Sequence, residues 1–212
     1  MIVCGDVTLQ AEREGATATT DTTERLVEAA RALMWEAGCP GFTVNQVVTA
    51  AGSSLKSFYR CFSSKDELLV ALFVDDARRG ADALAAMVQR RPPADRLRTV
   101  VVGLFRLLSA DGRLPYAAAL VGEHLRLSQS HAEAFSAVRR PFLELFAAEL
   151  SGAAGRGEIR AVDAEDDART VFHLVLSHLH AIIWHQIEED PTVVSDRLWA
   201  FCSAALRPGT DP

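Results

Sequence analysis

Residues 43–68 predict two short helices followed directly by the start of a long one. Three helices that begin so close together in the sequence constrain the fold more than any other feature. A capping box, in which side chains satisfy the first free N–H groups of a helix, is recognised by its spacing. Two such boxes occur here, Thr43 with Gln46 and Ser64 with Glu67. Gly52 lies between them, just before a predicted helix of residues 54–61. Short helices joined by a turn that contains glycine are typical of a helix-turn-helix unit.

Helical periodicity continues on both sides of this unit. Apolar residues from Leu26 to Ala37 fall on one helix face, and Asp21 with Glu24 has the spacing of its cap. Residues 1–20 are polar and without a period, which predicts a mobile arm. Further helices are predicted over residues 65–89, 94–109, 114–127, 130–150, 164–189 and 193–206. No stretch alternates with period two for long enough to indicate a sheet, so the sequence predicts an all-α fold.

The composition excludes several classes of protein. Hydrophobic residues make up 49% of the 212 residues, which is enough to bury a core and excludes a disordered or collagen-like chain. The four cysteines lack CxxC spacing, so they predict neither a zinc site nor a dense disulfide framework. No run approaches 18 apolar residues, and the amino terminus lacks the features of a signal peptide. We therefore expect a soluble, cytoplasmic protein without a membrane span.

The net charge of −6 argues against a globally basic nucleic-acid-binding protein. The charge is unevenly distributed, however. No acidic residue lies between Glu36 and Asp66, whereas this interval contains Lys56, Arg60 and Lys65. The negative charge elsewhere in the chain would limit non-specific binding to nucleic acid.

If residues 54–61 are helical, one face of this helix is apolar and the opposite face is cationic. The side chains expected to pack inward are Leu55, Phe58 and Phe62, and those expected to point outward are Lys56, Ser57 and Arg60. A short helix with a small, cationic front suits insertion into the major groove of DNA. The candidates for phosphate contacts around it are Tyr59, Lys65 and Thr43. On periodicity alone, an ordinary helical corner with solvated charges fits equally well.

The order of residues in this segment resembles the TetR family of bacterial transcriptional repressors. The DNA-binding region of that family typically reads A-G-V-S-x-x-T-[LF]-Y-x-[HY]-F-x-[SN]-K-x-x-L. The matches in register are Ala51, Gly52, Ser54, Phe58, Tyr59, Phe62, Ser64, Lys65 and Leu68, and Ser57 replaces a usual threonine. By motif the resemblance covers residues 22–70, and beyond them it extends only as helix number and length. It implies a DNA-binding set of Thr43, Ser54, Lys56, Ser57, Tyr59, Arg60 and Lys65.

The resemblance also implies a domain organisation. We expect an arm of residues 1–20, a three-helix DNA-binding domain with a helix-turn-helix over residues 21–67, and a helical ligand-binding and dimerisation domain over residues 68–212. Family members are homodimers whose last two helices form a four-helix interface, and they read a pseudo-palindromic operator. The candidate interface residues here are Leu179, Ile182, Ile183, Leu198 and Phe201. A monomer in which these residues are simply core is the alternative.

Ligand binding to the carboxyl-terminal domain of family members changes the spacing of the two recognition helices. The resemblance therefore implies a small-molecule effector of unknown identity that binds a largely apolar pocket between helices. The candidate lining residues are Phe105, Tyr116, Glu123, His124, Phe142, Phe146 and His180. Each of them also fits plain packing in a core or on a surface.

No metal, cofactor or enzyme active site is predicted. Two histidine pairs, 173 with 180 and 178 with 185, are each seven residues apart, a rise of about 10 Å that is too long for two ligands of one ion. No HExxH, GxSxG or GxxxxGK[ST] motif occurs, so an enzyme is not expected. The main alternative to a repressor is a helical ligand-binding dimer that has lost specific DNA binding.

Overall fold

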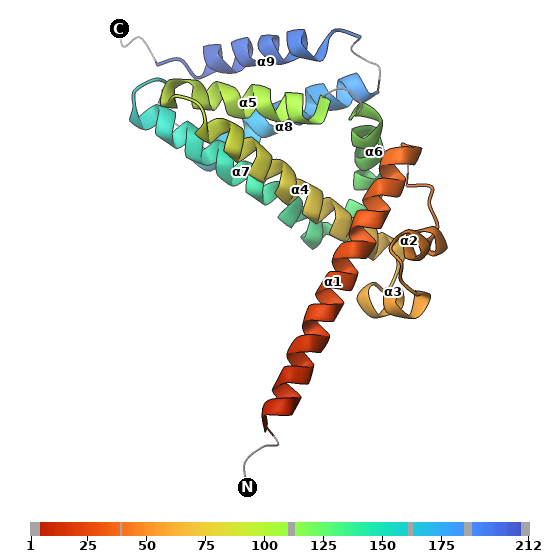
Figure 1. The fold of residues 1–212 in the computed structure, drawn as a ribbon. Helices are drawn as coiled ribbons and strands as arrows, with labels where there is room; N and C mark the ends of the chain where they lie inside the picture. Colours follow the sequence, from red (N-terminus) through yellow and green to blue (C-terminus); the bar gives the residue numbers. More distant parts are fainter. Residues whose placement is uncertain (1–4, 39, 110–112, 161–162, 185–187, 209–212) are drawn as a thin grey trace. The chain divides into compact units, whose positions relative to one another are not determined.

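The structure is a computed structural model that describes residues 5–38, 40–109, 113–160, 163–184 and 188–208, with the backbone alone for residues 5–19 and 125. Within these ranges the chain forms nine α-helices and no strand, which confirms the all-α fold (Figure 1). The helices are α1 (Gly5–Ala37), α2 (Val44–Ala50), α3 (Leu55–Cys61), α4 (Lys65–Gln89), α5 (Pro93–Ser109), α6 (Leu114–Ser130), α7 (Ala132–Gly155), α8 (Ala164–Ile183) and α9 (Pro191–Ala205). No helix in the described part of the chain is both long and apolar enough to cross a membrane.

The chain divides into two compact units, residues 1–72 and residues 73–212. In the first unit, α1, α2 and α3 pack against one another. Helix α1 contributes a stripe of fully buried side chains at i, i+4 and i+8, namely Leu26, Ala30 and Met34. Gly38 ends this helix in a left-handed conformation, with φ 61°, as its position in the sequence predicts.

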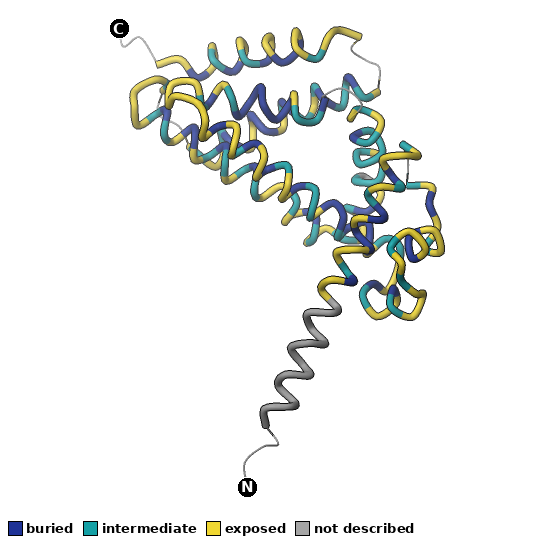
Figure 2. The backbone as a smooth tube through the Cα atoms, viewed as in Figure 1, coloured by how far each residue is buried: buried dark blue, intermediate teal, exposed yellow. Residues whose placement is uncertain are grey.

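In the second unit, α5, α7 and α8 pack on one another, and α6 and α9 pack against them. The buried residues of Figure 2 line the facing sides of these helices. An aromatic cluster joins α7 to α8, since the ring of Phe172 lies 6.0 Å from that of Phe142 and 5.9 Å from that of Phe146. Helix α4 packs closely on α5, because a Cβ atom added to Gly103 would lie only 2.8 Å from Cδ1 of Leu84.

Three expected helix boundaries are wrong. Helix α1 begins at Gly5, so Asp21 lies inside it and caps nothing. The residues before Asp21 include no proline, so none of them breaks a helix by removing a backbone donor. Helix α7 continues to Gly155, and α8 ends at Ile183 instead of near Glu189. The extent of the predicted arm as a mobile segment stays a prediction.

Candidate functional site

The turn between α2 and α3 is built from caps and one glycine. Thr43 and Gln46 form the expected capping box: Oγ1 of Thr43 accepts from the Gln46 N–H at 3.3 Å, and Oε1 of Gln46 accepts from the Thr43 N–H at 2.7 Å. After α2 the chain turns at Gly52, whose φ of 57° lies in the left-handed region that favours glycine. The N–H of Ser53 then donates to the carbonyl of Val48 at 2.8 Å and closes the turn.

Helix α3 is fixed to the first unit by its aromatic residues. Ser54 caps it, because Oγ of Ser54 accepts from the Ser57 N–H at 3.1 Å. Phe58 is fully buried, and its ring meets the edge of Tyr59 at 5.2 Å and the tilted ring of Phe62 at 5.8 Å. These contacts orient α3 so that the side opposite Phe58 faces solvent.

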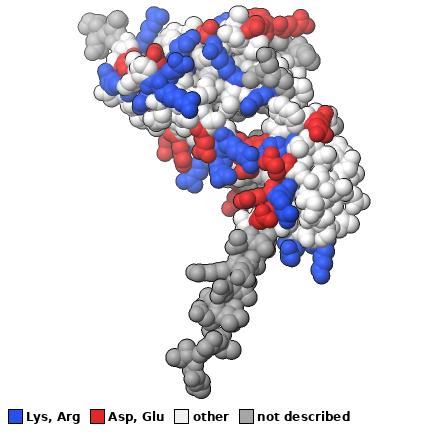
Figure 3. All heavy atoms as spheres, viewed as in Figure 1, with Lys and Arg blue, Asp and Glu red and all other residues white. Residues whose placement is uncertain are grey.

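The solvent-facing side of α3 carries the predicted cationic residues. Lys56, Tyr59 and Arg60 are exposed, Tyr59 by 60%, and no acidic side chain in the described part of the chain forms a salt bridge with Lys56 or Arg60. Figure 3 shows Lys and Arg side chains projecting over α3 from a surface that is otherwise largely uncharged. We call Leu55, Lys56, Tyr59 and Arg60 the α3 surface.

Leu55 belongs to this surface, although the sequence predicts it to be buried. It is 44% exposed. The periodicity that groups Leu55 with Phe58 and Phe62 assumes a helix through all three residues, but α3 ends at Cys61 and Phe62 has extended backbone (φ −138°, ψ 129°). Phe62 thus reaches the core after the helix has ended, whereas Leu55, the first residue of α3, faces solvent although it lies only three positions before the buried Phe58.

Lys65, at the start of α4, is held inside the first unit. Its Nζ donates to the carbonyl oxygen of Pro40 and lies 4.5 Å from the centroid of the Phe42 ring. The side chain is only partly exposed. These contacts join the start of α4 to the segment after α1, so the ammonium group has less freedom to reach a phosphate than the sequence predicts.

The predicted pocket residues fall into three groups. Phe105, Phe142 and Phe146 are buried in the apolar core of the second unit. His124 and His180 are half-buried, and burial is the main cause that lowers the pKa of each ring below its usual value. A lowered pKa favours the uncharged imidazole, which suits an apolar environment.

The two remaining candidates have polar partners. The hydroxyl of Tyr116, on α6, donates to the carboxylate of Asp76 on α4. Glu123 forms a salt bridge with Arg126 one turn further along α6. The Tyr116 bond joins α6 to α4, and the Glu123 pair lies along the surface of α6. Neither contact requires a ligand.

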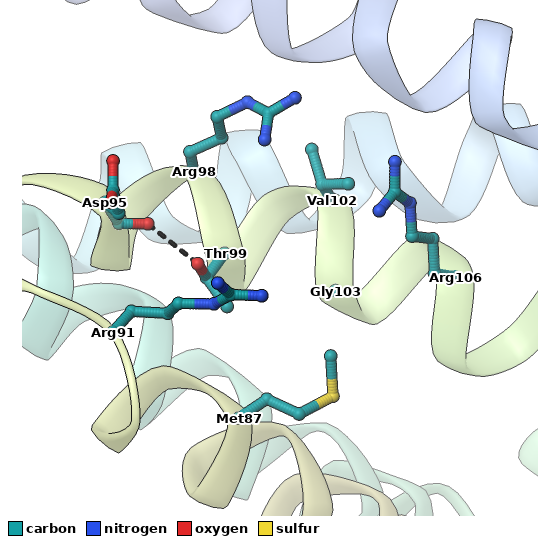
Figure 4. Close-up of a pocket in the computed structure, with 8 residues that line it drawn as sticks. All are labelled: Met87, Arg91, Asp95, Arg98, Thr99, Val102, Gly103 and Arg106. Atoms are coloured by element: carbon teal, nitrogen blue, oxygen red, sulfur yellow. Dashed lines mark hydrogen bonds between the residues drawn. The ribbon is translucent and has the colours of Figure 1, made fainter.

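A hollow of about 210 Å³ lies elsewhere in the second unit and includes none of the predicted pocket residues (Figure 4). It is lined by Met87, Arg91, Asp95, Arg98, Thr99, Val102, Gly103 and Arg106, and we call it the α5 hollow. Three of its eight lining residues are arginines. Sequence reasoning missed it, although Arg98 and Arg106 have the spacing that places two side chains on one helix face.

The residues expected at a dimer interface are distributed unevenly. Leu179, Ile182 and Leu198 are buried within the second unit and have little surface left for a partner. Ile183 is partly buried and Phe201 is 62% exposed. Two further large apolar side chains on the same part of the chain are exposed and were missed, Trp184 by 56% and Val193 by 54%. No group of three His, Cys, Asp or Glu side chains in the described ranges is placed to hold a metal ion, and His185 lies outside those ranges.

A comparison with protein families finds a match to part of the first unit. The family "Bacterial regulatory proteins, tetR family" matches residues 26–72. A comparison with curated proteins found no match.

Solved structures of low sequence identity share the fold of the chain. FadR from Bacillus subtilis, in complex with stearoyl-CoA, has a TM-score of 0.68 at 18% identity, over 87% of this chain and 99% of that one. The fatty acid degradation regulator FadR from Bacillus halodurans has a TM-score of 0.69 at 20% identity, over 87% and 99%. RolR in complex with resorcinol has a TM-score of 0.69 at 18% identity, over 91% of each chain.

The family match and the structural likeness agree with the arrangement of α1 to α3. The match spans the buried stripe of α1, the capped turn and the α3 surface. Residues 26–72 thus match the TetR family of bacterial regulatory proteins, and the chain shares its fold with solved structures of bacterial transcriptional regulators, including one described as a putative TetR-family regulator.

Proposed function

We propose that the protein is a transcriptional repressor that binds a pseudo-palindromic DNA operator as a homodimer and is released by a small-molecule effector. The observation that carries the proposal is the α3 surface, which has a tyrosine and two cations that form no salt bridge with the described residues, on a helix anchored by the buried Phe58. A cation without an acidic neighbour is available to a phosphate or to a base edge. The anchored ring keeps α3 from tilting when the helix enters a groove.

The charge pattern supports specific binding over general attraction. The α3 surface offers only two cations, and Lys65 is engaged with Pro40 and Phe42. Few phosphate contacts give weak non-specific affinity and a shallow dependence on salt. Specificity then depends on contacts to base edges from two copies of α3, one in each half-site.

The proposal is tested by selecting duplexes from a random-sequence library with the purified full-length protein at low salt. We expect enrichment of a sequence with two inverted half-sites and a gel shift by that duplex, with weaker binding to a shuffled duplex. Absence of any enriched sequence, with the protein folded and dimeric, would contradict the repressor and favour a ligand-binding dimer without specific DNA binding.

The homodimer is proposed to form through the exposed apolar residues of the last two helices. Trp184, Val193 and Phe201 follow or lie on α8 and α9, where three large apolar side chains exposed to solvent are unfavourable in a monomer. A second copy that covers them would remove this surface from water.

Replacing Phe201 by aspartate is expected to dissociate the dimer. A buried carboxylate without a partner destabilises an interface by several kcal/mol, so we expect roughly a hundredfold weaker dimerisation or more. Light scattering after size exclusion measures the mass. Val74→Asp is the matched control, because Val74 is also exposed but lies on α4. Equal dissociation by both variants, or by neither, would contradict this interface.

The effector is proposed to act through α4. This helix begins in the first unit and ends in the second, so an effector that favours one arrangement of the second unit biases the first. Relatives of the same fold have been solved with stearoyl-CoA and with resorcinol, which supports a small organic ligand. We place its apolar part near His124 and His180, whose uncharged rings would accept it.

Leu55 is expected to read a thymine methyl group in the operator. It is an exposed apolar side chain beside Lys56 on the surface proposed to enter the major groove, where the C5-methyl of thymine is the one apolar feature of the base edges. Replacing each thymine of the selected half-site by uracil should weaken wild-type binding several-fold at one position. Leu55→Ala should bind the thymine and uracil duplexes equally. Retention of the preference by Leu55→Ala would assign the contact to another residue.

A further inference from the structure

We propose that the α5 hollow binds a small molecule through a phosphate group. This proposal is independent of DNA binding and of the apolar effector region. It concerns residues of the second unit alone, and their arrangement is described by Figure 4.

Three arginines from two segments line the hollow. Arg98 and Arg106 lie on one face of α5 and extend to the same side of the helix, while Arg91 reaches toward Thr99 from the segment between α4 and α5 (Figure 4). A guanidinium group presents a planar fork of donors that matches the oxygens of phosphate. Two such forks, those of Arg98 and Arg106, extend to the same side of α5, and Arg91 adds a third cation to the lining.

The acidic residues nearby leave the hollow with an excess of positive charge. Arg98 and Arg106 share a single carboxylate, Asp196 of α9, at 2.9 Å and 3.9 Å. Asp95 lines the hollow, and no acidic side chain in the described ranges forms a salt bridge with Arg91. Three cations therefore face two carboxylates. One carboxylate cannot satisfy the donors of two guanidinium groups, so part of their hydrogen-bonding capacity stays open to an anion.

The rest of the lining indicates an organic phosphate. Met87 is 37% exposed and lies close to Gly103, and Val102 also lines the hollow, so the lining contains apolar residues next to the arginines. A hollow of about 210 Å³ accommodates a phosphate group with a small apolar body. Phosphate would compete with Asp196 for Arg98, so binding would loosen the ion pair that joins α5 to α9.

The test is calorimetric titration of the full-length protein with phenyl phosphate, inorganic phosphate and phenol. We expect saturable binding of phenyl phosphate, weaker binding of inorganic phosphate and none of phenol. Arg91→Gln and Arg98→Gln should each weaken the binding of phenyl phosphate about tenfold, the usual effect of losing one charged hydrogen bond. Asp196→Asn should strengthen it several-fold, because the competing carboxylate is removed.

The matched control is Arg140→Gln, an exposed arginine of α7 that pairs with Glu144 and lies outside the hollow. It should leave the affinity unchanged. Arg91→Gln breaks no salt bridge of the described residues, so a loss of binding in this variant does not follow from a broken pair. Equal weakening by Arg140→Gln, weaker binding by Asp196→Asn, or equal binding of chloride and phosphate (an adventitious ion only) would each overturn the proposal.

Discussion

Replacing Phe58 by alanine is expected to unfold the amino-terminal unit while the second unit stays folded. Phe58 has no exposed surface and contacts the rings of both Tyr59 and Phe62. Removing a buried phenyl ring costs about 3–5 kcal/mol, and small domains are stable by about 5–15 kcal/mol in total. The loss therefore consumes most of the stability of a unit of this size. DNA binding should disappear with it.

Hydrogen exchange detected by mass spectrometry separates the two units in one experiment. In Phe58→Ala, amides of α2 and α3 should exchange freely, whereas amides of α5 should keep their protection. Tyr59→Ala is the matched control, because Tyr59 is adjacent but 60% exposed, and it should change the stability by less than about 1 kcal/mol. If both variants lost protection to the same extent, the assignment of Phe58 as the anchor of α3 would be wrong.

Replacing Lys56 and Arg60 together by alanine is expected to abolish specific recognition of the operator. Each cation lies on the exposed side of α3 without an acidic partner in the described ranges, and a good contact to a base contributes about 1–3 kcal/mol of discrimination. The double variant should therefore bind the selected duplex roughly a hundredfold more weakly per half-site. Its stability should be unchanged, because neither side chain is buried.

The single variants distinguish the roles of the two cations. We expect Lys56→Ala to weaken specific binding more than binding to random DNA, and Arg60→Ala to reduce the salt dependence of both by about one unit of slope, as for one lost phosphate contact. Lys65→Ala is expected to destabilise the first unit by detaching the segment of Pro40 and Phe42. Identical effects of Lys56→Ala on selected and random duplexes would contradict base readout.

Local signals in the sequence predicted much of the first unit. The cap of α2 involves Thr43 as expected, and at the start of α4 the Ser64 hydroxyl accepts from the Glu67 N–H at 3.2 Å as expected, because capping depends on residues only three positions apart. The exposure of Leu55 could not be predicted from spacing, since Leu55 and the buried Phe58 lie three positions apart in one helix and only the packing of α3 in the first unit decides which of them is covered. The contact between Lys65 and Pro40 could not be predicted from local sequence either, because it joins residues 25 positions apart.

The sequence predicted the helices of the second unit but not the α5 hollow. Periodicity identifies an apolar helix face, yet it does not say whether that face packs against the core or against a partner subunit. Leu179 and Leu198, for example, are buried in the core of the second unit. Arg98 lines the α5 hollow, and the carboxylate that binds it, that of Asp196, lies 98 positions further along the chain. No local pattern contains such a pair.

Helix α4 sets a rule for exchanging parts between proteins of this fold. It spans 25 residues without interruption, and the boundary between the two units falls after its eighth residue, Leu72. Each residue added to a helix advances it by about 1.5 Å and turns it by about 100°. A chimaera joined within α4 must therefore keep the number of residues in this helix. One inserted residue would rotate the first unit, which carries α3, by more than a quarter turn about the helix axis. An insertion of seven residues, two helical turns, would nearly restore the phase while adding about 10 Å of length.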